Sequence, residues 1–250
     1  MESIEILGCR VDAIDRAQAV SCIAALAQTE RGALVVTIGV EMVMAAQHDT
    51  AYRALLNASK LNVCDTIGLL LASRARGGPL RERVTGVGLV EALAERSAAS
   101  ADLRLYFLGA ADDTAERAAA ELTRRFPGAR IVGARNGYFA PAESGAIAAR
   151  IAASGANVLL AGLGLGKQEA WIARFGAACG VGVGLGVGGS FDVFAGNVRR
   201  APRALQQAGL EWAYRLVSDP KRWRRQLALP QFAIAELREV VQARKGTAAP

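Results

Sequence analysis

The hydrophobic positions of this chain follow two patterns that alternate along most of its length. Short apolar runs, typical of buried strands, alternate with segments whose apolar residues recur every three or four positions, typical of amphipathic helices. We expect strands at residues 4–7, 34–36, 61–63, 103–109, 129–134, 158–161 and 181–187. We expect helices at residues 15–29, from about 40, and at 50–58, 66–74, 87–99, 112–126, 141–154 and 167–178. This alternation predicts an α/β fold, a Rossmann-like, mostly parallel sheet flanked by helices.

The pattern changes after Gly196. Residues 199–244 carry no strand signal and hold two of the three Trp residues. Helices are expected near residues 203–217, from Pro220 onward, and at 231–244. We therefore predict an α/β domain at residues 1–198, followed by a basic helical C-terminal appendage at residues 199–250.

Positive charge is concentrated in that appendage. The chain has a formal net charge of +7, and the stretch from Arg199 to Arg225 holds seven Arg and one Lys against only Glu211 and Asp219. The remainder of the chain is nearly neutral. An anionic partner is therefore expected near this stretch.

The block PKRWRRQL indicates which anionic partner to expect. Arg222 and Arg225 share one face of a helix, and Trp223 and Leu227 lie on a neighbouring face. Basic residues beside Trp suit an anionic membrane surface. Clustered arginines also occur in nucleic-acid-binding proteins, but neither an aromatic stacking platform nor a helix-turn-helix pattern accompanies them, so we expect no nucleic-acid partner.

Other classes are disfavoured by composition. The cysteines are scattered and the chain has a single His, so a zinc site or a disulfide framework is not expected and a reducing compartment is favoured. The N-terminus lacks an apolar signal core. The longest uncharged run, residues 175–191, has 17 residues, seven of them Gly, which is poor as a membrane-spanning helix. We expect a cytoplasmic protein.

One stretch, ANVLLAGLGLGKQEAW at residues 156–171, stands out as strand, glycine-rich turn and helix start. Glycines stand at positions 162, 164 and 166, directly before Lys167, Gln168 and Glu169. Such a turn exposes backbone N–H groups to an anion, although a tight turn that binds nothing is equally consistent with the glycines alone. The spacing fits neither a P-loop nor the dinucleotide fingerprint, so a phosphate-bearing ligand of another kind is expected.

Polar or glycine residues follow several of the expected strands. Because the carboxyl ends of parallel strands meet at one edge of a sheet, these residues are expected to line a common ligand site. They are Thr37, Asp65, Gly109, Asn136 and the turn from Gly162 to Gln168.

Two charged residues near these ends have two interpretations each. Asp65 is either a general base whose pKa is raised by partial burial or the N-cap of the helix that follows it. Arg83, among several loop arginines, is either a phosphate clamp or a solvated residue. The chain contains no Asp-x-Asp pair to hold a divalent ion, so we expect arginines to meet any phosphate charge, with neither metal nor cofactor.

Taken together, these stretches resemble the WecG/TagA/CpsF family, glycosyltransferase family 26, in order over roughly residues 1–230. The segments that carry the resemblance are VVTIGVEMVMAAQHD, VCDTIGLLLASR, RERVTGVGLVEAL, LYFLGA, IVGARNGYF, LLAGLGLGKQEAWI, GVGGSFDVFAGNVRRAP and GLEWAYRLVSDPKRWRR. The resemblance implies an inverting transferase of bacterial surface-polysaccharide synthesis. Such an enzyme moves a hexose-type sugar from a UDP-sugar to an undecaprenyl-diphosphate-linked sugar at the cytoplasmic face of the plasma membrane.

The resemblance also implies roles for individual residues. Asp65 is implied as the general base, and Thr37 as a residue that positions the sugars or the diphosphate. Groups implied to hold the donor or the lipid diphosphate are Arg83, Gly109, Asn136, Gly162, Gly164, Gln168, Glu169, Arg215, Arg222 and Arg225. A homo-oligomer is possible.

Two positions depart from the family pattern. Gly39 stands where the family usually has Asn, and Thr66 replaces the usual Gly after the aspartate. A different donor sugar, among N-acetylmannosamine, glucose and a uronic acid, or a weaker activity would follow. A non-catalytic UDP-sugar-binding scaffold or regulator of a polysaccharide assembly complex is the alternative.

Overall fold

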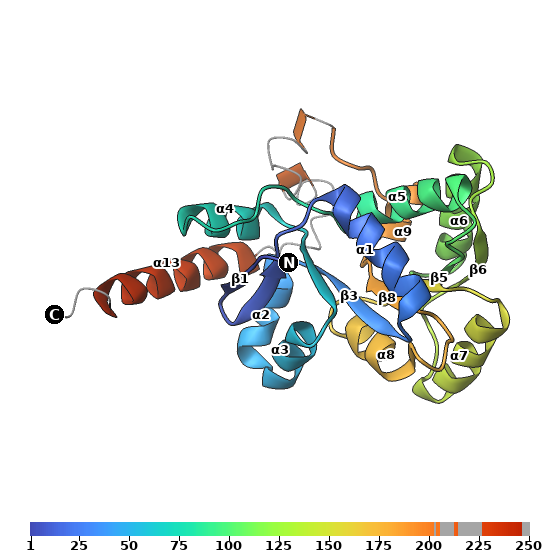
Figure 1. Ribbon diagram of the computed structural model, residues 1–250, viewed down its shortest axis with the longest axis horizontal. Coiled ribbons are helices and arrows are strands. Elements are labelled where there is room, and N and C mark those ends of the chain that lie inside the picture. Colours follow the sequence, from blue (N-terminus) through green and yellow to red (C-terminus); the bar gives the residue numbers. More distant parts are fainter. Residues whose placement is uncertain (203, 206–212, 215–226, 247–250) are drawn as a thin grey trace.

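The computed structural model describes residues 1–202, 204–205, 213–214 and 227–246 (Figure 1). Within them lies an eight-stranded sheet in the order β1-β2-β4-β3-β8-β7-β5-β6. Its strands are β1 (Ser3–Ile6), β2 (Cys9–Asp12), β3 (Ala33–Ile38), β4 (Leu61–Cys64), β5 (Leu105–Gly109), β6 (Ile131–Arg135), β7 (Val158–Gly162) and β8 (Val183–Gly186). All neighbours pair in parallel except β1 and β2. The predicted fold class is confirmed.

Helices cover both faces of the sheet, and Figure 1 shows the two layers. One core contains apolar residues of α2 (Val40–His48), α3 (Thr50–Asn57), α7 (Ser144–Ala153) and α8 (Lys167–Phe175). The other core contains those of α1 (Arg16–Thr29), α5 (Gly86–Ala99), α6 (Thr114–Arg125) and α9 (Ser190–Phe194). A 3-10 turn, η1 (Pro141–Glu143), precedes α7. In both layers the helices bury the apolar residues that recur every three or four positions in the sequence.

The chain leaves neighbouring strands toward alternate faces. β3 and β7 lead into α2 and α8 on one face, whereas β8 and β5 lead into α9 and α6 on the other. In open α/β sheets, ligands bind beyond the carboxyl ends of strands at points where the exits diverge in this way. The central strands of this sheet therefore present a suitable edge for a ligand.

Local signals explain most element boundaries. Asp15 accepts from Gln18 N and closes a capping box before α1, and Asp49 accepts from Tyr52 N before α3. The hairpin of β1 and β2 was not predicted, because β2 is only four residues long and reads CRVD. Its two turn residues, Leu7 (φ 48°) and Gly8 (φ 76°), both have positive φ, as a type I′ hairpin turn requires.

A few helix predictions need correction. Helix α8 ends at Phe175 rather than at residue 178, and the five-residue α9 was not predicted. The predicted helices at 203–217 and from Pro220 fall largely outside the described residues. The predicted C-terminal helix is present as α13 (Ala228–Gly246).

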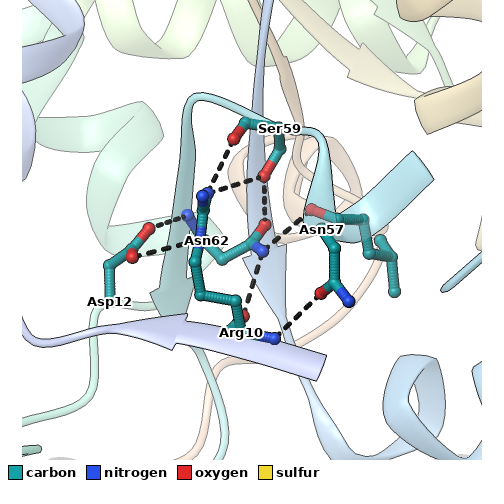
Figure 2. Close-up of polar contacts among 6 residues, drawn as sticks. Arg10, Asp12, Asn57, Ser59 and Asn62 are labelled. Atoms are coloured by element: carbon teal, nitrogen blue, oxygen red, sulfur yellow. Dashed lines mark hydrogen bonds and ion pairs between the residues drawn. The ribbon is translucent and has the colours of Figure 1, made fainter. Parts of the chain in front are cut away.

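A buried polar network ties β2 to the strand that ends at the candidate site (Figure 2). Asn62 of β4 is fully buried; its N–H donates to Asp12 (2.7 Å), and its amide accepts from Ser59 Oγ (2.6 Å) and donates to the carbonyl of Arg10 (3.0 Å). Asn57 accepts from the N–H of Arg10 (2.9 Å). Because β2 and β4 share only one register pair, these bonds hold the N-terminal half of β4 in place.

Helix α13 packs against α2 and against α4 (Ile67–Ala75). Its Phe232 is buried, and a Cβ placed on Gly68 would lie 3.8 Å from the Phe232 ring. Arg76 pairs with Glu236 (2.5 Å) and Glu239 (3.0 Å) of α13. The described end of the appendage therefore lies against the α/β part, next to the helix that follows Asp65. The domain division itself stays a prediction.

Candidate active site

Asp65 lies at the carboxyl end of β4 and is partly buried. Its Oδ1 accepts a hydrogen bond from the N–H of Gly86 at 2.9 Å, and Gly86 is the first residue of α5. The N-terminus of a helix stabilises an ionised carboxylate, which is the form a general base needs. The N-cap of α4 is Thr66, so the interpretation of Asp65 as the cap of its own helix is wrong; its carboxylate contacts a different helix.

Thr37 stands near Asp65 at the end of the adjacent strand β3. Its hydroxyl donates to the carbonyl of Gly186 in β8 at 2.9 Å. A Cβ placed on Gly86 would lie 3.5 Å from Thr37 Oγ1 and 3.2 Å from Ser190 Oγ. Side chains from the ends of β3 and β4 and from the start of α9 therefore converge on the N-terminus of α5.

Arg83 enters the same region from the loop before α5. The N–H of the next residue, Val84, donates to the carbonyl of Cys64 at 2.7 Å, which holds the loop against the end of β4. The pKa of the Cys64 thiol is raised to about 12, mainly by burial and also by the Asp65 carboxylate, while the Arg83 guanidinium lowers it in part. Both charges are therefore close enough to β4 to act on one thiol.

Gln168 approaches this region from the opposite layer, at the start of α8. It is only 4 % exposed, and its Oε1 accepts from the N–H of Gly188 at 3.2 Å. A Cβ on Gly186 would lie 2.6 Å from Gln168 Nε2, so only a glycine in β8 leaves room for this amide. Since Thr37 donates to the carbonyl of the same Gly186, both Thr37 and Gln168 approach the last residue of β8.

Glu169 is fully buried and holds the turn together rather than facing outward. Its Oε2 accepts from the N–H of Gly166 (2.8 Å) and from the Tyr52 hydroxyl (3.3 Å), and its Oε1 accepts from Gln168 Nε2 (2.7 Å). Burial raises the pKa of Glu169, and these hydrogen bonds lower it in part. Burial also raises the pKa of Tyr52, which stays a neutral donor. The geometry favours a role for Glu169 in positioning Gln168.

The glycines and Asn136 have local structural functions. Gly109 has φ +152°, and a Cβ on it would lie 2.5 Å from the carbonyl oxygen of Gly162. A Cβ on Gly162 would in turn lie 2.7 Å from the carbonyl oxygen of Gly188. Gly164 needs its positive φ of 92°, and Asn136 accepts from Tyr138 N at 3.2 Å in a tight turn. Substrate binding by these four positions stays a prediction.

Three of the predicted site residues belong to the appendage. Arg215, Arg222 and Arg225 fall outside the described residues. Over the described part of the chain, no group of three or more His, Cys, Asp and Glu side chains is placed to hold a metal ion. Over the same part, no helix is long and apolar enough to cross a membrane.

Two contributors were missed by the sequence analysis. Ser190, at the start of α9, donates to the carbonyl of Val187 at 2.6 Å and lies against Gly86. Tyr52 reaches Glu169 across 117 positions of sequence. The buried side of α3 carries Tyr52 and Leu56, so the apolar periodicity of this helix was the only signal that Tyr52 points inward.

This arrangement can perform acid–base chemistry on a neutral hydroxyl. At the carboxyl ends of the parallel strands it gathers a carboxylate held by a helix N-terminus, a threonine, a loop that carries an arginine, and a buried amide. A hydroxyl bound against Asp65 can lose its proton to the carboxylate. The positive charge of Arg83, in the loop before α5, can stabilise an anionic leaving group.

The chain is similar to known proteins over most of its length. The family model described as "Glycosyl transferase WecG/TagA/CpsF family" matches residues 4–246. A protein of Bacillus spizizenii named N-acetylglucosaminyldiphosphoundecaprenol N-acetyl-beta-D-mannosaminyltransferase is 36% identical over 208 residues, which is 83% of this chain and 80% of that protein. A protein of Bacillus subtilis with the same name is 32% identical over 208 residues, with the same coverage.

Proposed function

Because this chain belongs to the WecG/TagA/CpsF family of glycosyl transferases, we propose that it moves a hexose-type sugar from a UDP-sugar to an undecaprenyl-diphosphate-linked sugar. The reaction would serve bacterial surface-polysaccharide synthesis. The names of the two relatives support an N-acetylglucosaminyl-diphosphoundecaprenol acceptor and N-acetylmannosamine as the first donor sugar to test. Glucose and a uronic acid are the next donors, because Gly39 and Thr66 depart from the family pattern.

The Asp65 carboxylate is the observation that carries this proposal. Its hydrogen bond to Gly86 N fixes one oxygen at the N-terminus of α5, and helix N-termini attract negative charge. In the proposed step, Asp65 takes the proton of an acceptor hydroxyl while the hydroxyl oxygen attacks the anomeric carbon. The bond from that carbon to the diphosphate breaks, UDP leaves, and the configuration at the anomeric carbon is inverted.

Other residues bind and orient the two substrates. Thr37 lies at the end of β3 and orients the sugars or the diphosphate next to Asp65. Arg83 offers positive charge to the diphosphate, and the Gly164 turn with Gln168 lies where a donor group can approach backbone N–H groups. Arg215, Arg222 and Arg225 are proposed, from the sequence, to neutralise UDP and the lipid diphosphate.

The position of the protein in the cell follows from this acceptor. A lipid-linked acceptor stays at the membrane, so we propose that the protein binds peripherally to the cytoplasmic face of the plasma membrane. The basic appendage supports this proposal, because arginine beside Trp suits an anionic lipid surface. Helix α13 lies against α4, which begins two residues after Asp65, and so brings the described end of the appendage close to the base.

A panel assay tests the function. The full chain is incubated in EDTA with UDP-N-acetylmannosamine, UDP-glucose, UDP-N-acetylglucosamine or a UDP-uronic acid, with and without a short-chain polyprenyl-diphosphate N-acetylglucosamine. Release of UDP that requires the acceptor, with one donor preferred, is the expected result. UDP-sugar binding without acceptor-dependent release from any donor would contradict transfer and favour a non-catalytic scaffold.

A further inference from the structure

The first turn of α2 is capped by a residue from the start of another helix, α4. Helix α2 starts after Gly39, which has no side chain to accept from the free N–H groups of that turn. The hydroxyl of Thr66 accepts from the N–H of Val40 at 3.2 Å instead. Thr66 is itself the N-cap residue of α4, yet within the described part of the chain it makes no side-chain capping bond to α4. Its hydroxyl is therefore used on the neighbouring helix.

The same side chain fills the space above Gly39. A Cβ placed on Gly39 would lie 2.9 Å from the Thr66 methyl carbon Cγ2, closer than real Cβ contacts. Gly39 has φ −129° and ψ 170°, an extended conformation that any residue adopts, so the backbone does not require glycine here. Glycine is required only because the Thr66 side chain leaves no room for a Cβ at position 39. Thr66 cannot easily move away, because it is β-branched and its hydroxyl is bonded to Val40 N.

This packing takes place directly beside the proposed base. The Cβ position of Gly39 is 4.0 Å from Asp65 Oδ2, so whatever occupies this space borders the carboxylate. A hydroxyl can accept up to two hydrogen bonds and donate one. After accepting from Val40 N, the Thr66 hydroxyl still has its proton to donate to an oxygen atom bound next to Asp65.

We propose that Gly39 and Thr66 form a matched pair in which Thr66 takes the place of a side chain at position 39 and is a specificity-determining residue for the sugar bound against Asp65. This assignment rests on the proposed function, in which the group bound there is a hydroxyl of the acceptor sugar. The two departures from the family pattern, Gly39 and Thr66, are then coupled, because the Thr66 methyl occupies the space of a side chain at position 39. Thr66 links the starts of α2 and α4 and offers the acceptor a single hydrogen-bond donor.

A double-mutant cycle tests the packing without reference to activity. Gly39→Ala should lower the Tm by roughly 3–10 °C, because its new methyl meets Thr66 Cγ2. Thr66→Ser keeps the hydroxyl and removes only that methyl, so it should change the Tm by less than about 3 °C. The double variant should recover most of the loss caused by Gly39→Ala. Additive Tm changes would overturn the matched pair.

A second comparison tests specificity. Thr66→Val keeps the shape and loses the hydroxyl, so it should raise the acceptor KM about tenfold or more and leave the donor KM within about twofold. Thr66→Ser should keep both KM values near those of the wild type. Equal changes in both KM values for Thr66→Val, or none, would overturn the specificity role.

The outcome for the wild-type protein separates the two proposals. A wild type that transfers no sugar to any acceptor overturns the proposed function and, with it, the assignment of Thr66 to the acceptor, while the Tm cycle still decides the packing. A wild type that transfers sugar, combined with an additive cycle and an unchanged acceptor KM in Thr66→Val, overturns this inference alone.

Discussion

The two sides of the candidate site differ in how their polar groups are used. On the β4 side, Asp65, Thr37, Thr66 and Arg83 are all partly exposed. On the α8 side, Gln168 and Glu169 are 4 % and 0 % exposed, and every side-chain oxygen of this pair accepts from a donor of the protein. The polar groups of the first side are hydrogen-bonded but remain partly exposed, whereas those of the second side are enclosed by the fold.

This difference separates chemistry from support. A group that reacts must reach the substrate, whereas a buried, hydrogen-bonded carboxylate is costly to disturb and is better suited to fixing a loop. The segment most visible in the sequence, the glycine turn with Lys-Gln-Glu, belongs mainly to the supporting side. Substitution of Asp65 should therefore change activity at nearly constant stability, and substitution of Glu169 should change stability first.

The largest effect is expected at Asp65. Asp65→Asn keeps an oxygen that can accept from Gly86 N but removes the proposed base, so kcat should fall by about 100- to 10,000-fold. UDP-sugar binding, measured by calorimetry, and the Tm should stay near wild type. As a control, Asp113→Asn removes an exposed pair with Arg117 and should leave kcat unchanged. Full activity of Asp65→Asn would remove Asp65 from the mechanism.

Truncating Glu169 should have the largest effect on stability. Glu169→Ala leaves the donors of Gly166, Tyr52 and Gln168 without their buried acceptor, which should cost at least about 3 kcal/mol of the free energy of unfolding. Urea denaturation measures this cost. Glu30→Ala, which breaks an exposed pair with Lys60, should cost less than about 1 kcal/mol. Similar losses in both variants would contradict the supporting role.

The pH dependence of stability should identify the same carboxylate. The pKa of Glu169 is raised above the ordinary value of 4.5 by burial, so the folded state favours the protonated form. The stability that the protonated carboxyl adds to the folded state is fully present below about pH 4.5. It is lost as the pH rises through the raised pKa of Glu169. The advantage in free energy of unfolding over Glu169→Gln should therefore be largest in acid and shrink toward neutral pH. A constant difference between pH 4 and pH 8 would be inconsistent with a buried, titrating Glu169.

Local signals in the sequence account for most of the fold. Asp15 and Asp49 stand before amphipathic runs and cap α1 and α3, and the alternation of strands and helices predicts the parallel sheet. The hairpin strand Cys9–Asp12 was not predicted, because its alternation of apolar and charged residues extends over only four positions. It pairs through β1 and the Asn62 network, which depend on tertiary contacts.

The candidate site was predictable only in part, for the same reason. Asp65 and Thr37 follow apolar runs, so their place at strand ends follows from the pattern. The contact of Asp65 with α5 joins positions 21 apart, and that of Thr66 with α2 joins positions 26 apart. Glu169 in the first turn of a helix is also typical of an exposed residue that complements the helix dipole. Its burial depends on Tyr52, which belongs to a different helix.

The smallest effect is expected for Tyr52→Phe, which tests whether the Glu169 cluster supports the fold without taking part in the reaction proposed at Asp65. Tyr52→Phe removes only the 3.3 Å hydrogen bond to Glu169 and keeps the ring in the core. Gly166 and Gln168 still donate to the carboxylate, so the loss should be small. The free energy of unfolding should fall by about 0.5–1.5 kcal/mol, measured by urea denaturation. Because Tyr52 lies behind Gln168 rather than beside Asp65, kcat should stay within about twofold of wild type. A large loss of kcat at unchanged stability would instead place Tyr52 and Glu169 on the reacting side.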